Sequence, residues 1–138
     1  MTPIRILLVD DSEDLRLLCR LILEVDAAFH MCGEAANGEE ALAMVRSCSP
    51  DVVVLDLDMP IMDGLTALPL LRERHPSVPV VVLTAGATPD VCREALRRGA
   101  HAAVSKDPAM HQLKVAILDA CRKPAGGAAR ASSMASCG

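Results

Sequence analysis

Residues 50–60 read Pro-Asp-Val-Val-Val-Leu-Asp-Leu-Asp-Met-Pro, a short apolar run that passes directly into an acidic loop. The run Val52–Leu55 is rich in β-branched side chains, as expected of a strand that is buried on both faces of a parallel sheet. Two further runs of this kind, Ile4–Val9 and Val78–Leu83, lie on either side of it in the sequence. Together they predict a parallel sheet, with Asp56 at the end of one strand.

Segments with a helical period alternate with the apolar runs. Leu15, Leu18 and Ile22 share one helical face, because they follow the i, i+3, i+4 spacing. The predicted strands are 4–9, 29–34, 51–56, 79–83 and 101–104, and the predicted helices are 13–25, 38–48, 65–74, 89–98 and 108–122. The alternation predicts an α/β fold: a doubly wound, five-stranded parallel sheet with strand order 2-1-3-4-5 and helices on both faces.

Local signals mark where several helices begin and end. Asn37 followed by Glu40 resembles a capping box, and the pairs Thr88-Pro89 and Asp107-Pro108 each place a cap residue before a proline. Gly99 is typical of a helix stop. Pro69 fits a helix only in its first turn, which predicts a start near Thr66. Residues 1–123 are expected to form one domain, and the aperiodic residues 124–138 a flexible tail.

Composition excludes several classes of protein. The 138 residues include one aromatic, Phe29, and carry a formal charge of −4, so neither base stacking nor a basic nucleic-acid face is expected. No apolar run reaches the roughly 20 residues of a membrane span, and the N-terminus does not resemble a signal peptide. The six cysteines lack zinc-site spacing, and we expect them to be reduced in a cytoplasmic protein.

The side chains that could bind a ligand or react lie where the predicted strands end. Open α/β sheets bind ligands at the carboxyl ends of their strands. Five polar residues fall there: Asp10 and Asp11 after the first strand, Asp56 after the third, Thr84 at the end of the fourth and Lys106 after the fifth. With the first, third and fourth strands adjacent, these side chains are expected to converge on one small pocket.

Three carboxylates in one pocket repel each other unless a cation or protons neutralise them. Mg²⁺ is the cation of choice, because it accepts a few carboxylates and keeps waters that a phosphate can displace. With the metal and Lys106, the pocket approaches neutrality and can admit an anionic phosphoryl group. Asp56 is then a plausible nucleophile that forms an aspartyl phosphate, while Lys106 and Thr84 stabilise the transferring group.

These residues resemble those of receiver domains in two-component response regulators. The matching motifs are Leu8-Val9-Asp10-Asp11-Ser12, Pro50–Pro60, Met62-Asp63-Gly64, Val82-Leu83-Thr84-Ala85 and Gly99-Ala100 through Ser105-Lys106, so the resemblance covers residues 4–122. The stretch Glu34–Leu42 and Lys106-Asp107 look most like the nitrate-response subfamily, whose members usually carry a LuxR-type DNA-binding domain. The resemblance implies a flavodoxin-like fold and a signalling domain that is phosphorylated and dephosphorylated, not a turnover enzyme.

The resemblance also assigns roles. Asp56 would accept a phosphoryl group from a sensor histidine kinase or a phosphotransfer protein. Asp11, Asp56 and the backbone carbonyl of Asp58 would bind Mg²⁺ directly, and Asp10 would act through a water on the ion. Thr84 and Lys106 would contact the phosphoryl oxygens and relay the switch to a protein-interaction face.

Three features depart from the family pattern. Ala103 stands where many receivers have an aromatic switch residue, so output is expected to travel through backbone and packing changes. Asp58 places an acid near the phosphoryl group, which is expected to alter the rates of phosphorylation or hydrolysis. No DNA-binding domain follows the last helix, so the chain is either a stand-alone regulator or part of a longer protein. The output partner is open, and homodimerisation through the last strand and helices is a family possibility.

Three alternatives remain at this stage. Asp56-Leu57-Asp58 fits the Asp-x-Asp signature of haloacid-dehalogenase-type phosphatases, although that motif belongs after the first strand. A nucleotide- or flavin-binding module has similar architecture, but the first loop lacks a Gly-rich phosphate cradle. The third alternative is a receiver-like binding module that no longer cycles phosphate, which Ala103 keeps open.

Overall fold

The computed structural model describes residues 2–107 and 110–122. Five strands form one parallel sheet in the order β2-β1-β3-β4-β5, as predicted. The strands are β1 (Ile4–Val9), β2 (Phe29–Ala35), β3 (Val52–Leu55), β4 (Val80–Thr84) and β5 (Ala102–Ser105). The helices are α1 (Glu13–Glu24), α2 (Gly38–Cys48), α3 (Gly64–Arg74), α4 (Pro89–Arg97) and α5 (His111–Cys121). This is the doubly wound α/β fold expected from the sequence.

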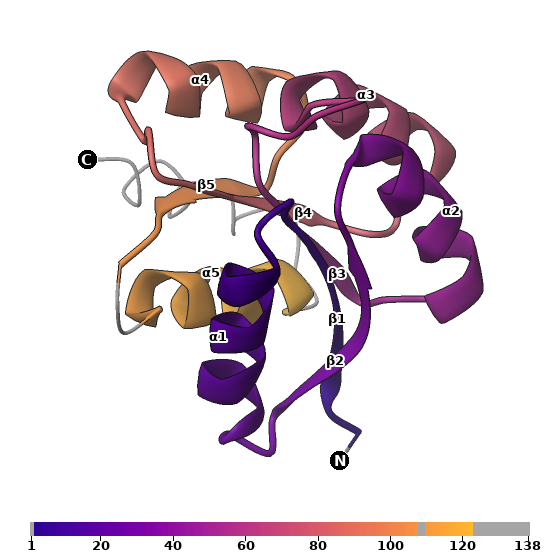
Figure 1. Ribbon diagram of the computed structural model, residues 1–138, viewed down its shortest axis with the longest axis vertical. Coiled ribbons are helices and arrows are strands. Elements are labelled where there is room, and N and C mark those ends of the chain that lie inside the picture. Colours follow the sequence, from indigo (N-terminus) through magenta and orange to yellow (C-terminus); the bar gives the residue numbers. More distant parts are fainter. Residues whose placement is uncertain (1, 108–109, 123–138) are drawn as a thin grey trace.

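Helices cover both faces of the sheet. Helices α1 and α5 lie against one face, and α2, α3 and α4 lie against the other (Figure 1). Every residue of β3 and β4 is buried, because these strands are inside the sheet and covered on both sides. The alternate side chains of a strand therefore enter two separate cores, for example Val53 on the α2–α4 side and Val54 on the α1–α5 side.

Side-chain caps fix the starts of four helices. Ser12, Asn37, Asp63 and Thr88 each accept a hydrogen bond from the backbone N–H three positions further on, at 3.2, 3.0, 2.8 and 3.3 Å respectively. Each cap satisfies one of the backbone donors that a helix N-terminus leaves without an intrahelical partner. The expected starts of α2 and α4 are thus correct, and Gly99, with φ of +113°, ends α4 as expected.

Helix α3 begins earlier than Pro69 suggested. It is capped by Asp63 and starts at Gly64, so Pro69 lies in the second turn, not the first. A proline there provides no N–H for the carbonyl of Leu65, four residues before it. Arg98 replaces that donor, because its Nη1 bonds the Leu65 oxygen at 2.9 Å. A residue at the end of α4 therefore compensates for a proline inside α3.

The start of α5 also differs from the prediction. The helix begins at His111 and not near Asp107-Pro108, and residues 108–109 lie outside the described residues. Met110 precedes it in a left-handed conformation, with φ of 54°, and its side chain provides no cap. The predicted tail, residues 124–138, is also outside the described part.

The cysteines follow the expectation only in part. Cys19, Cys32, Cys48 and Cys121 are free thiols. Cys92 is disulfide-bonded, so the expectation that all six cysteines are reduced is wrong. Among the described residues, no helix combines the length and the apolar character that crossing a membrane requires.

Candidate functional site

The pairing of β1 with β3 brings the candidate acids together. Val9 and Leu55 are partners in this pair, so Asp10 and Asp56 follow neighbouring strand ends. The backbone N–H of Asp56 also bonds the Val9 oxygen at 2.9 Å, which extends the ladder to the site itself. The relative position of the two carboxylates is therefore set by the sheet and not by a mobile loop.

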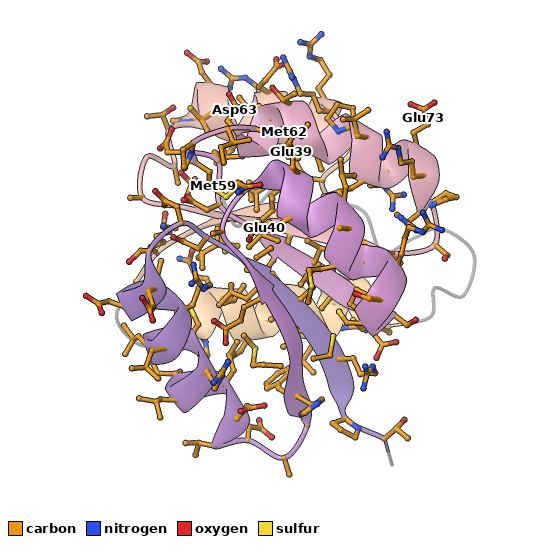
Figure 2. All side chains as sticks on the ribbon, turned by 45° about the vertical axis from the view of Figure 1, so that its right-hand side comes forward. Glu39, Glu40, Met59, Met62, Asp63 and Glu73 are labelled. Atoms are coloured by element: carbon orange, nitrogen blue, oxygen red, sulfur yellow. The ribbon has the colours of Figure 1, made fainter. Side chains whose placement is uncertain are left out.

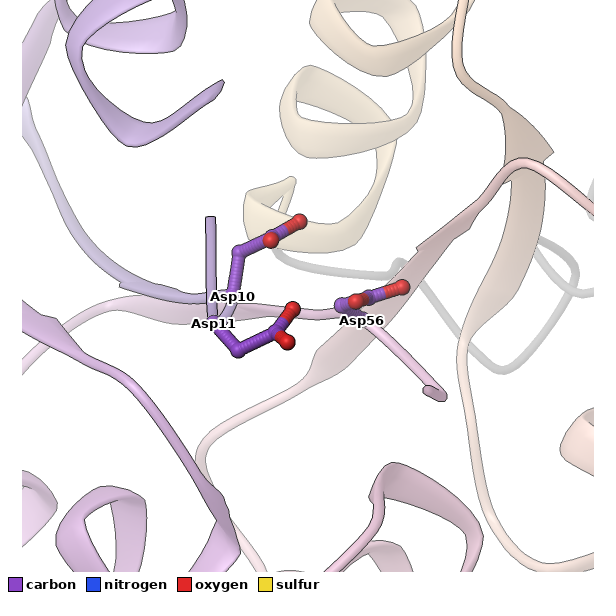
Figure 3. Close-up of side chains that lie close together, drawn as sticks. All are labelled: Asp10, Asp11 and Asp56. Atoms are coloured by element: carbon purple, nitrogen blue, oxygen red, sulfur yellow. The ribbon is translucent and has the colours of Figure 1, made fainter. Parts of the chain in front are cut away.

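Asp10, Asp11 and Asp56 form one carboxylate cluster. Each contributes an oxygen that lies within 4.8 Å of the others, and Figure 3 shows the three side chains gathered at the ends of β1 and β3. Asp10 and Asp56 are only 1% and 5% exposed, whereas Asp11 is exposed. The cluster is therefore buried on one side and open to solvent on the other.

Lys106 supplies the positive charge at this site. Its Nζ lies 2.9 Å from Asp10 Oδ2 and 3.4 Å from Asp56 Oδ1. The lysine follows β5, and its backbone N–H bonds the Thr84 oxygen at 3.3 Å, so the end of β4 positions it. One lysine facing three carboxylates leaves the site with an excess of negative charge.

The pKa values show this excess. Burial raises the pKa of Asp56, and the charge of Asp10 raises it further, while Lys106 and the Leu57 N–H act in the opposite direction. Burial disfavours the charged ammonium of Lys106, but its bonds to Asp10 and the charge of Asp56 outweigh burial and raise its pKa. The protein's own groups thus do not fully compensate the negative charge of Asp56, and a bound cation would do so.

The cluster fits a hard divalent cation. Its donors are carboxylate oxygens, which Mg²⁺ prefers, and exposed Asp11 leaves room for waters and for a phosphate oxygen. Asp58 lies on the exposed loop after β3, and its carbonyl accepts no hydrogen bond from the described residues. That carbonyl is therefore available as a further ligand.

Thr84 and Ala103 occupy the positions expected of them. Thr84 is 1% exposed at the end of β4, and its Oγ1 accepts the Gly86 N–H at 3.3 Å. Ala103 is fully buried inside β5, on the α4 side of the sheet. The small side chain at 103 means that no aromatic ring is present there to follow the threonine.

The loop between β3 and α3 is shaped by close backbone contacts that the sequence analysis did not explain. A Cβ on Gly64 would lie 2.2 Å from the Asp56 carbonyl oxygen, so only glycine allows α3 to start this close to Asp56. The N–H of Gly38 bonds the Met62 oxygen at 2.8 Å, so the loop packs against the first turn of α2, where Figure 2 labels Met62. The Met62-Asp63-Gly64 motif was the available signal for this packing.

Arg16 is a second residue that the sequence analysis missed. Its Nη1 donates to the Asp10 backbone oxygen, and its Nε bonds Glu34 Oε1 at 3.0 Å. The Ser12 N–H bonds Asp10 Oδ1 at 2.8 Å. These contacts fix the backbone and side chain of Asp10, but no local pattern around Arg16 predicts them.

Comparison with known proteins agrees with this geometry. The family model of the response regulator receiver domain matches residues 6–118, and the chain belongs to that family. Phosphorylation-dependent switching is general in this family, whose members bind Mg²⁺ at an acidic pocket and interact with histidine kinases or phosphotransfer proteins. The chain is thus a signalling domain, as the motifs indicated.

Curated relatives include several large proteins that contain such a domain. The protein-glutamate methylesterase/protein-glutamine glutaminase of Pyrococcus horikoshii is 46% identical over 82 residues, which are 59% of this chain and 22% of that protein. The Moorella thermoacetica protein of the same name is 38% identical over 125 residues, 91% of this chain and 26% of that protein. The chain thus spans about a quarter of the length of these relatives.

Solved receivers have the same fold. The response regulator domain of Thermotoga maritima CheB has a TM-score of 0.80 and 27% identity, covering 88% of this chain and 99% of that one. Borrelia burgdorferi CheY, in the CheX-CheY-BeF3-Mg+2 complex, scores 0.79 with 28% identity, covering 88% and 91%. The Mycobacterium tuberculosis NarL receiver scores 0.75 with 27% identity, covering 84% and 98%. The resemblance to receivers is confirmed, with both CheB and nitrate-response types among the similar chains.

Proposed function

We propose that Asp56 accepts a phosphoryl group, with Mg²⁺ bound by Asp11, Asp56 and the Asp58 carbonyl and assisted by Asp10. The observation that carries this proposal is the nearly buried Asp56 carboxylate inside an acidic cluster that contains one lysine, 3.4 Å away. The donor is the phosphohistidine of a sensor histidine kinase or a phosphotransfer protein. The domain works in the cytoplasm and comprises residues 1–123.

The two oxygens of Asp56 have different surroundings. Oδ1 accepts the Leu57 N–H at 2.9 Å and lies near Lys106. Among the described residues, no group donates a hydrogen bond to Oδ2. Every fully buried side-chain oxygen in this part of the chain does have a hydrogen-bond partner. Oδ2 is therefore not fully buried and is open to solvent. Oδ2 is therefore the oxygen that can reach an incoming phosphorus atom.

The transfer uses these groups as follows. Asp56 Oδ2 attacks phosphorus, the P–O bond forms, and the P–N bond to the donor histidine breaks as its electron pair returns to the imidazole. When bound, Mg²⁺ neutralises charge on the phosphoryl oxygens. Lys106 provides a second positive charge, and the Thr84 hydroxyl turns from Gly86 to donate a hydrogen bond.

The switch reaches the rest of the molecule through β4 and β5. Thr84 pairs with Ser105, and the Lys106 N–H bonds the Thr84 oxygen, so a movement of Thr84 displaces both strand ends. With alanine at 103, this backbone link replaces a rotating aromatic side chain. The output surface is the face of α4, β5 and α5, and it binds a partner protein, a second copy of the chain or an output domain.

Phosphorylation by a small donor tests the proposal. The purified protein is incubated with acetyl phosphate and Mg²⁺, and its intact mass is measured. We expect an adduct of one phosphoryl group that requires Mg²⁺ and is absent from Asp56→Asn. The matched control is Asp58→Asn, which removes a nearby exposed carboxyl but keeps its carbonyl and should still form the adduct.

Absence of the adduct in the wild type, together with no detectable Mg²⁺ binding, would leave a receiver-shaped module that does not cycle phosphate. The phosphatase alternative is disfavoured by the fold, because Asp56 follows β3 and not β1. Multiple-turnover hydrolysis of p-nitrophenyl phosphate would be needed to revive it.

A further inference from the structure

A β-bulge places a cysteine on the edge of the sheet, outside the acidic cluster. In the pairing of β1 with β2, Ile6 faces Met31 but the next residue, Leu7, faces Gly33. Cys32 is therefore the extra residue of the bulge. A bulge changes the direction of the side chains that follow it, and here Cys32 lies on the α2 side of the sheet. Strand β2 is at the sheet edge and Cys32 is partly exposed, so small solutes can reach this position.

A second free thiol lies against this bulge. Cys48 is the last residue of α2, and its Sγ is 3.0 Å from the Sγ of Cys32. A disulfide needs about 2.05 Å between the sulfurs, so the two atoms have to approach by about 1 Å. Among the free thiols of the described residues, this is the pair in direct contact.

The surroundings of the pair hold the two thiols together. A side chain at position 33 would crowd this pair, because a Cβ there would be 3.2 Å from Cys48 Sγ and 2.7 Å from Met44 Cε. Glycine at this position leaves room for the thiol of Cys48. Arg5 bonds the Cys48 backbone oxygen at 2.7 Å and ties the end of α2 to β1. Cys48 is 8% exposed, whereas Cys32 is more accessible, so a solute meets Cys32 first.

We propose that Cys32 and Cys48 are a redox modification site that closes to a disulfide on exposure to a peroxide. Hydrogen peroxide transfers one oxygen to the Cys32 sulfur, giving a sulfenic acid and one molecule of water. The Cys48 sulfur then attacks the Cys32 sulfur: the S–S bond forms, the S–O bond breaks, and the hydroxyl leaves with the Cys48 proton as a second water. A small dithiol reverses the reaction.

The bond has a defined structural consequence. It joins the last turn of α2 to the edge strand, while the first residue of α2, Gly38, bonds Met62 in the loop that follows Asp56. The disulfide therefore restrains one end of a helix whose other end packs against the candidate phosphorylation loop. The proposal itself does not depend on phosphorylation.

The test is oxidation of the full chain by hydrogen peroxide, followed by peptide mapping without reduction. We expect a linked peptide containing Cys32 and Cys48, an intact mass lower by about 2 Da and return to the starting mass with dithiothreitol. The intact mass also reports over-oxidation. Cys32→Ser and Cys48→Ser should each lose the linked peptide.

Cys121→Ser is the matched control, because Cys121 is also a partly exposed free thiol but should leave the linked peptide unchanged. Linkage of Cys32 or Cys48 to other cysteines at equal yield would overturn the proposal, as would irreversible oxidation of Cys32 with Cys48 intact. Circular dichroism of both serine variants should match that of the wild type, which would exclude unfolding as the cause of the lost linkage. Phosphorylation by acetyl phosphate is measured separately, so that failure of one proposal is distinct from failure of the other.

Discussion

Two clusters of charged side chains on this molecule differ in their ratio of cations to carboxylates. The acidic pocket contains Asp10, Asp11 and Asp56 around Lys106. On α4, Glu94 is held by two arginines: Arg97 Nη2 lies 2.6 Å from its Oε1, and Arg98 Nε lies 2.6 Å from its Oε2. The first cluster has too few cations for its carboxylates, and the second has more than one for a single carboxylate.

The two balances shift carboxylate pKa values in opposite directions. Hydrogen bonds from Arg98 and Arg97 lower the pKa of Glu94, whereas burial and the charge of Asp10 raise the pKa of Asp56. The carboxylate of Glu94 on α4 is thus fully compensated by the arginines, whereas the carboxylates of the acidic pocket are not fully compensated by Lys106. Carboxylates that are held in a fixed, partly buried position without enough compensating positive charge indicate a site where a ligand binds.

Replacing Lys106, the cationic side chain of the acidic pocket, should give the largest difference in stability between the two clusters. Lys106→Met keeps the aliphatic stem but leaves Asp10 and Asp56 buried without their ammonium, and we expect a loss of about 2–3 kcal/mol in unfolding free energy at pH 7 without Mg²⁺. Urea denaturation measures it. The matched change on the other cluster, Arg97→Met, should leave the urea midpoint within error, because Arg97 is 75% exposed and Arg98 still holds Glu94. Equal losses would refute the distinction between the clusters.

Magnesium should complete the acidic pocket and leave the other cluster unaffected. At 10 to 100 times its dissociation constant, Mg²⁺ is expected to raise the unfolding free energy by about 1.4–2.7 kcal/mol relative to EDTA. Thermal melts with and without the metal provide the measurement. Asp11→Asn should lose most of this gain, whereas Asp14→Asn, an exposed acid on the first turn of α1, should retain it.

Removing one carboxylate should relieve the repulsion in the pocket. Without Mg²⁺, Asp56→Asn is expected to be more stable than the wild type by about 1 kcal/mol at pH 7. Since folding raises the pKa of Asp56, its contribution is most favourable below its unfolded pKa of about 3.9 and is lost as the pH rises through the folded value. The advantage of asparagine should therefore shrink at pH 4, and denaturation at both pH values tests this. An advantage that does not change with pH would point to a packing effect.

The smallest effect sharpens the account of the α4 cluster. Arg98→Ala should cost up to about 1 kcal/mol, chiefly because the Leu65 carbonyl loses its donor, and not because of the ion pair. In a Pro69→Ala background, residue 69 regains an N–H for that carbonyl, so the cost of Arg98→Ala should fall. A double-mutant cycle by urea denaturation measures the coupling. Strict additivity would mean that Arg98 acts through Glu94 alone.

Much of the fold could be predicted because its signals are local. The strand at Ile4–Val9 and the helix at Gly38–Cys48 were predicted at their observed bounds, since continuous apolar runs and side-chain caps act within a few residues. The predictions failed where distant groups intervene. Pro69 is tolerated in the second turn of α3 because Arg98 reaches across from α4. The late start of α5 is a local exception, since Met110 directly before it has a left-handed conformation.

By itself, the sequence determined the order of strands and helices and the identity of the polar residues at the strand ends. The tertiary structure decided which side chains meet: Lys106 contacts Asp10, 96 positions away, and Cys32, the extra residue of a bulge in β2, contacts Cys48 of α2. The tertiary structure also decided the directions of the pKa shifts of Asp56 and Lys106, because the burial and the neighbouring charges that cause them come from several elements. Patterns along the chain report which face of an element is buried, but contacts between elements arise only after the whole core has formed.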